Sequence, residues 1–67
     1  MTIGKRIMEL RAKKGWTQGE LAAASKTSQR AVSAYENEDR TPNVKTISKL
    51  SAAFGMTFNE FIEGVDL

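Results

Sequence analysis

A chain of 67 residues that contains neither cysteine nor histidine has few ways to stabilise a fold. A domain of this size buries only about 60% of the surface that its unfolded chain exposes, so it is marginal without further stabilisation. Disulfides are absent, and a zinc site would lack its usual ligands. We therefore expect one domain over residues 1–67, stabilised by closely packed helices and by self-association.

Several classes of protein are not expected from this sequence. No apolar run approaches the 18 residues of a membrane span, and charged Lys5, Arg6 and Glu9 interrupt the first ten residues, unlike a secretory leader. The lack of cysteine fits a reducing compartment. We expect a cytoplasmic protein with no membrane partner.

An enzyme is also not expected, because no histidine or cysteine is present to act as a base or nucleophile. The acidic cluster of Glu36, Glu38 and Asp39 lacks the ligand spacing and central glycine of a calcium loop. We expect no catalytic residue, no metal and no cofactor.

Apolar residues recur at helical spacing along the whole sequence, and the strict alternation typical of β-strands is missing. The pattern predicts an all-α fold of five helices at about residues 3–13, 18–25, 29–36, 44–54 and 58–63. Four of the predicted helices follow a candidate N-cap, in order Thr2, Thr17, Ser28 and Thr57, and the fourth helix is expected to start after Asn43. The predicted core consists of Ile7, Leu10, Leu21, Val32, Ile47, Leu50, Phe54 and Ile62.

The second and third predicted helices, within residues 17–36, are separated by a three-residue turn. Such a short turn joins helices at a steep angle, as in the helix-turn-helix motif. The third helix is only weakly apolar and begins with Gln29 and Arg30. A glutamine amide matches adenine N6 and N7, and an arginine guanidinium matches guanine O6 and N7. An exposed polar face on a small bundle would give the same pattern, so both interpretations stay open at this point.

The charges are distributed unevenly although the net charge is only +2. Most of the basic residues lie in the first 30 positions, whereas residues 51–67 contain three acidic residues and no basic one. This asymmetry is typical of a molecule that presents one side to a polyanion, and ordinary solvated charge explains it equally well.

Short stretches at matching spacing over residues 3–64 resemble the phage repressor and Cro-type helix-turn-helix proteins, also called the xenobiotic-response-element type. They are residues 4–7, 10–11, 15–18, 20–22, 28–32, 35–37, Pro42 and 50–55. The resemblance implies a repressor-like five-helix bundle. It also implies a sequence-specific transcriptional regulator, a repressor, that reads the major groove of double-stranded DNA with residues 29–36. The operator would then have inverted-repeat half-sites for a homodimer.

The resemblance also implies roles for individual residues. Base-reading positions are Gln29, Arg30, Ser33 and Ala34. Phosphate-contacting positions are Gln18, Ser28 and Lys45, and Gln18 is also expected to brace the first reading residue. Lys26 departs from the family pattern, and we expect its cationic side chain to reach a phosphate as well. Arg11 and Glu36 match a structural ion pair that ties the first helix to the end of the reading helix.

Four departures from the family pattern lie close to the motif. Lys26 stands at the turn position where glycine with positive φ is usual, which costs about 1 kcal/mol or more. Ser25 and Thr27 replace residues that are usually apolar. Glu38 replaces a common glycine and, with Asp39, adds negative charge near the expected DNA edge.

The end of the sequence is unusually apolar for one short helix, with Met56, Phe58, Phe61, Ile62, Val65 and Leu67. Exposed apolar patches mark contacts, so we expect a dimer interface at Phe58, Phe61, Met56 and Val65. Alternatively, Phe61 and Ile62 belong to the core.

A competing functional class is a DNA-binding antitoxin, or another protein-interaction module on the same fold. That class needs a partner surface besides the reading helix, and the sequence offers little beyond Gly64 to form one. A further protein partner stays open.

Overall fold

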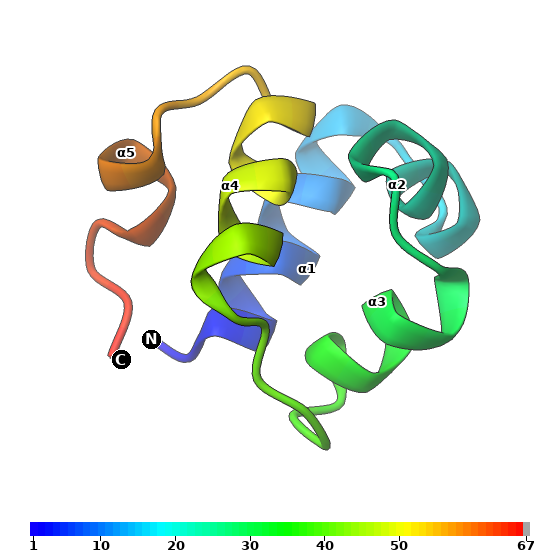
Figure 1. Cartoon of the computed structure of the whole chain (residues 1–67), viewed down its shortest axis with the longest axis horizontal. Coiled ribbons are helices and arrows are strands. Elements are labelled where there is room, and N and C mark those ends of the chain that lie inside the picture. Colours follow the sequence, from blue (N-terminus) through cyan, green and yellow to red (C-terminus); the bar gives the residue numbers. More distant parts are fainter. Residues whose placement is uncertain (67) are drawn as a thin grey trace.

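The computed structural model describes residues 1–66. Leu67, one of the apolar residues that the sequence analysis noted near the end of the sequence, lies outside the described residues. Five helices follow one another: α1 (Ile3–Lys14), α2 (Gln18–Ser25), α3 (Gln29–Glu36), α4 (Val44–Ala53) and α5 (Phe58–Ile62) (Figure 1). No strand occurs within residues 1–66. The all-α prediction is confirmed, and each predicted helix end lies within one residue of the observed one.

The four predicted N-caps are confirmed, and Asn43 caps α4 in the same way. At each of the five, a side-chain oxygen accepts from a backbone N–H three residues further on. Thr17 and Thr57 form complete capping boxes with Glu20 and Glu60. These caps satisfy backbone donors that the first turn of a helix leaves unpaired, which is why the boundaries follow the sequence so closely.

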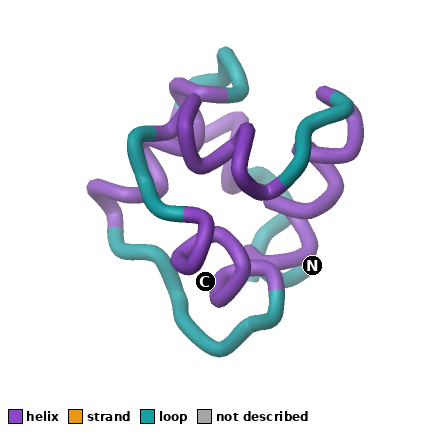
Figure 2. The backbone as a smooth tube through the Cα atoms, turned by 90° about the vertical axis from the view of Figure 1, so that its right-hand side faces the viewer, coloured by secondary structure: helices purple, strands orange, loops and turns teal. Residues whose placement is uncertain are grey.

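The helices are arranged with α2 and α3 on one side, α5 on the opposite side, and α1 and α4 between them (Figure 1). Figure 2 views the molecule from the side of α2 and α3. None of the described helices is long and apolar enough to cross a membrane.

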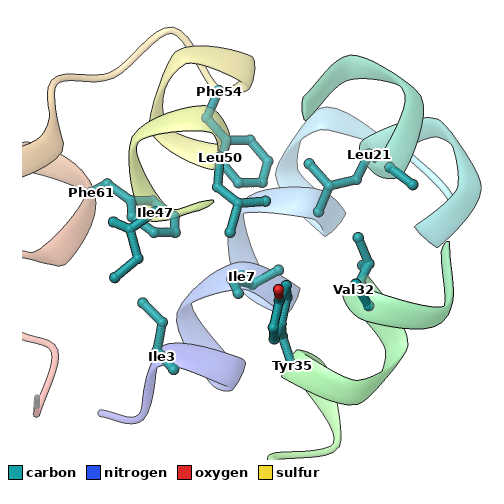
Figure 3. Packing of buried hydrophobic residues seen from close by; sticks show 11 residues of the cluster. Ile3, Ile7, Leu21, Val32, Tyr35, Ile47, Leu50, Phe54 and Phe61 are labelled. Carbon is teal, nitrogen blue, oxygen red and sulfur yellow. The ribbon is translucent and has the colours of Figure 1, made fainter. Parts of the chain in front are cut away.

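The apolar core lies where all five helices meet (Figure 3). It consists of Ile3, Ile7, Leu21, Ala22, Ala31, Val32, Tyr35, Ile47, Leu50, Phe54 and Phe61. Two core predictions need correction, because Leu10 and Ile62 are only partly buried and pack against the edge of this cluster. On α5 the fully buried side chain is instead Phe61, whose ring stacks on Phe54 with centroids 5.9 Å apart.

Candidate nucleic-acid interface

Helix α3 is fixed to the bundle by one side and exposes residues at its beginning. Ala31, Val32 and Tyr35 are buried against the core. Gln29 and Arg30, the first two residues of the helix, are exposed, and no side-chain hydrogen bond holds either of them within residues 1–66. The helix therefore presents two unengaged polar side chains from a rigid support.

The remaining predicted reading residues lie further along α3. Ser33 and Ala34 are both half-buried, so they offer less surface than the first turn. Ser28 is exposed at the N-cap, and its hydroxyl oxygen accepts from the Ala31 N–H at 3.0 Å. That hydroxyl retains its own proton for donation to an external acceptor.

In the turn between α2 and α3, the residue at the position where the family usually has glycine adopts the left-handed backbone conformation. Lys26 adopts φ 56° and ψ 41°, and its N–H donates to the Ala23 carbonyl at 3.3 Å. The Thr27 N–H donates to the Ala22 carbonyl at 2.9 Å, which completes a Schellman motif. The Lys26 side chain is exposed at this turn.

Two polar residues at the same turn satisfy each other in place of apolar packing. The buried Ser25 hydroxyl donates to the Leu21 carbonyl at 2.7 Å and lies 2.8 Å from the Thr27 hydroxyl. Because these groups have partners, the motif tolerates the loss of the usual apolar residues without an unsatisfied buried polar atom.

The predicted ion pair between Arg11 and Glu36 is confirmed and is bidentate. Arg11 Nε donates to Glu36 Oε2 at 2.7 Å, and Nη2 donates to Oε1 at 3.0 Å. The Glu36 side chain is only 2% exposed and that of Arg11 21%. The hydrogen bond to Glu36 raises the pKa of Arg11, although burial of the guanidinium opposes the shift. Arg11 also donates to the Trp16 carbonyl at 2.8 Å, which links α1 to the start of α2.

Gln18 joins this ion pair, which sequence reasoning did not foresee. Its Nε2 donates to Glu36 Oε1 at 3.1 Å, so Glu36 connects α1, α2 and α3. The amide of Gln18 is thus directed at Glu36. We had expected Gln18 to brace the first reading residue, Gln29, and within residues 1–66 no hydrogen bond joins the two side chains. A carboxylate accepts this bond because it has lone pairs left after the bidentate contact with arginine.

The Gln29 amide instead lies beside Gly19, in the first turn of α2. A β-carbon built on Gly19 would lie 3.2 Å from Gln29 Oε1 and 3.8 Å from its Cδ. The glutamine amide therefore occupies the space that a side chain at position 19 would need. The sequence shows the glycine but not the contact, because the contact depends on how α2 and α3 cross.

The predicted phosphate-contacting lysines, Lys26 and Lys45, are exposed. Lys45 lies in the first turn of α4, after the N-cap Asn43, whose side chain accepts from the Thr46 N–H at 2.8 Å. Within residues 1–66 none of Lys26, Arg30 or Lys45 forms an ion pair. These cationic groups are available to an external anion.

Arg40 is a further cation near α3 that sequence reasoning missed. Its guanidinium carbon lies 5.6 Å from the centroid of the Tyr35 ring, an arrangement typical of a cation–π contact. The signal in the sequence was an arginine four residues after the end of the reading helix. The exposed Glu38 and Asp39 precede it, and Glu38 has a left-handed φ of 64°.

The predicted interface residues on and around α5 divide into two groups. Met56, Phe58 and Val65 are half-buried and pack against the edge of the core. Phe61 has no exposed surface, so its assignment to an interface was wrong. The reason is that a helix of five residues directs one side chain straight into the bundle, and here that side chain is Phe61.

Comparison with known proteins extends over nearly the whole chain. The sequence pattern of the helix-turn-helix family matches residues 7–61. The chain is 35% identical over 66 residues to the HTH-type transcriptional regulator ImmR of Bacillus subtilis. This match covers 98% of this chain and 51% of ImmR. It is 36% identical over 64 residues to the uncharacterized HTH-type transcriptional regulator y4dJ of Sinorhizobium fredii, covering 96% of this chain and 83% of that protein.

A third relative is the HTH-type transcriptional regulator PuuR of Escherichia coli, 33% identical over 58 residues. That match covers 87% of this chain but 31% of PuuR. The chain therefore spans about half the length of ImmR and about a third of the length of PuuR.

Proposed function

Since this chain belongs to the Cro/CI-type helix-turn-helix family, we propose that it binds a specific site in double-stranded DNA and thereby regulates transcription. The observation that carries the proposal is the presentation of Gln29 and Arg30. Both are exposed at the start of a helix whose opposite side is buried, and neither has a side-chain partner within residues 1–66. An α-helix fits the major groove, with its first residues at the base edges.

Base recognition is assigned to the outer face of α3. Arg30 offers a two-pronged donor for guanine O6 and N7, and Gln29 offers a donor and an acceptor for adenine. Ser33 can hydrogen-bond to either purine, and Ala34 can contribute a methyl contact to thymine. Ser33 and Ala34 are half-buried, so we assign most of the discrimination to the first two residues.

Phosphate contacts are assigned to groups that flank α3. Lys26 lies in the turn before the helix and Lys45 at the start of α4, and both are exposed. Ser28 can donate its hydroxyl proton, and Gln18 can donate the amide proton that Glu36 does not accept. Each neutralised phosphate adds about 0.9 to the slope of log affinity against log salt concentration.

A homodimer is the proposed DNA-binding form, with Met56, Phe58 and Val65 in its interface. These apolar side chains remain partly exposed around α5, where Glu60, Glu63 and Asp66 make the surface unfavourable for phosphates. Two copies related by a twofold axis would read an inverted-repeat operator whose half-site centres lie about 34–36 Å apart, or a multiple of that distance. We propose repression as the regulatory outcome, because a dimer across an operator blocks access by other proteins.

Selection of bound sites from random duplex DNA tests this function. The expected result is a single enriched inverted repeat. Enrichment of no sequence would overturn specific DNA binding, and enrichment of one unrepeated site would overturn the dimer. Co-purification of a stable partner that is needed for DNA binding would favour the antitoxin class instead.

A further inference from the structure

We propose that Gly19 is a specificity-determining position, because the absence of its side chain sets the conformation of the base-reading residue Gln29. The inference rests on the proposed function and adds a residue to the reading surface that contacts no base itself. Gly19 lies in α2 and Gln29 begins α3, so the position acts across the helix-turn-helix motif.

A side chain at position 19 would crowd one close neighbour, the Gln29 amide, which would have to shift by a few tenths of an ångström. A β-carbon there would lie 3.2 Å from Gln29 Oε1, a separation closer than nine in ten ordinary β-carbon contacts. The Thr17 hydroxyl oxygen would lie 3.8 Å away, which is ordinary van der Waals contact. Alanine at position 19 therefore leaves the Thr17 cap in place and requires only the Gln29 amide to move.

The location of the contact gives the amide a preferred orientation. Gly19 is in the first turn of α2, where unpaired N–H groups and the helix dipole produce a positive potential. An amide oxygen is favoured there over the amide nitrogen. The open space at Gly19 permits this conformation of the Gln29 side chain, and a side chain at position 19 would disfavour it.

The consequence is separable from folding stability. The atom that must move is the end of a flexible side chain at the surface, and alanine is a better helix former than glycine. The Gly19→Ala variant should therefore fold at least as well as the original protein. Its affinity for random DNA should also be unchanged, because no cationic group is altered.

The test compares Gly19→Ala, Gln29→Ala and the double variant on the selected operator and on its single-base substitutions. Gln29→Ala identifies the base pair that Gln29 reads. Gly19→Ala should reduce discrimination at that base pair by about fivefold, the lower end of what one bidentate amide–base contact contributes. The double variant should behave as Gln29→Ala alone.

Ala24→Gly provides the matched control, because it changes helix propensity at an exposed position of α2 and should leave base preference intact. Full discrimination by Gly19→Ala at the base pair that Gln29 reads would overturn the inference while the proposed function stands. A loss that persists at the same size in the Gln29→Ala background would overturn it as well. Absence of any base preference in the original protein would overturn the proposed function and this inference together.

Discussion

Lys26 and Glu38 adopt the left-handed backbone conformation at the two ends of α3, with φ of 56° and 64°. Glycine is unstrained in this conformation, whereas other residues are disfavoured by roughly 1–2 kcal/mol. We expect Lys26→Gly and Glu38→Gly each to raise the free energy of unfolding by about 0.5–1 kcal/mol, because the greater chain entropy of unfolded glycine offsets part of the relief. Urea denaturation measures the change.

The two substitutions should affect DNA binding in opposite directions. Lys26→Gly removes a cation beside the reading helix, so affinity for all DNA sequences should fall and the salt slope should decrease by about 0.9. Glu38→Gly removes an anion and should strengthen binding to all sequences. Equal effects of both variants on DNA affinity would show that the charges near α3 do not face phosphates.

Arg30 is the residue whose replacement should change specificity. Arg30→Ala should cost about 1–3 kcal/mol at the cognate site and relax the preference at one base pair. Lys45→Ala is the control for a backbone contact, and it should weaken cognate and random DNA alike. Binding titrations on both DNAs measure the difference. A uniform loss for Arg30→Ala would remove its assignment as a base reader.

At the scale of elements, Glu36 connects three helices through one nearly buried carboxylate. Glu36→Gln leaves the Arg11 guanidinium without its charged partner, and loss of one member of a buried pair costs about 3–5 kcal/mol. We expect about 3 kcal/mol, the lower end of that range, because a fifth of the Arg11 side chain is exposed. Glu9→Gln serves as control, since the Glu9 side chain is 43% exposed and its contacts with Arg6 and Lys13 are long, at 3.6 and 3.8 Å. Such a pair is worth at most about 1 kcal/mol. Unchanged unfolding of Glu36→Gln would refute the structural role.

Helix α5 begins with a capping box whose carboxylate responds to pH. The backbone N–H of Thr57 donates to Glu60 at 2.8 Å and, with the Thr57 side chain, lowers the pKa of Glu60 from its ordinary value of 4.5. A lowered pKa in the folded state contributes stability above pH 4.5 that is lost as the pH falls through the folded-state value. Thermal melting should show the original protein more stable than Glu60→Gln at pH 7, with the difference shrinking in acid. A stability difference between the two proteins that stays constant from pH 7 into acid would contradict this role of the capping box.

The helices could be predicted closely because their limits depend on local chemistry. Thr57 and Asn43 form hydrogen bonds within their own turns, and those bonds need no distant partner. The choice of Phe61 over Ile62 as the buried residue of α5 could not be predicted, because both positions fit a helical stripe and only the approach of α4 separates them. The contacts of Gln18 and Gln29 were missed for the same reason, since each depends on the crossing of two helices. The roles of the reading residues remain predictions that only DNA binding can test.

For the whole molecule, self-association should depend on the apolar surface around α5. Phe58→Asp places a charge in the proposed interface and should convert a sedimenting dimer into a monomer, with loss of cooperative operator binding. Met8→Asp is the control, since Met8 is 43% exposed on α1 and lies outside this surface. Phe61→Ala should instead reduce stability by about 3–5 kcal/mol, as expected for a buried aromatic residue. A monomer at tens of micromolar in the original protein would contradict the proposed dimer.

The central claim is that this small bundle distinguishes one DNA sequence from others through α3. The most direct measurement is a titration of the intact protein against its selected operator and a scrambled duplex of equal length, repeated at several salt concentrations. The account predicts at least about 10³-fold tighter binding to the operator at physiological salt, with two protomers per site. It also predicts a salt dependence for both duplexes that reflects the shared phosphate contacts. Equal affinity for the two duplexes at every salt concentration would contradict the claim.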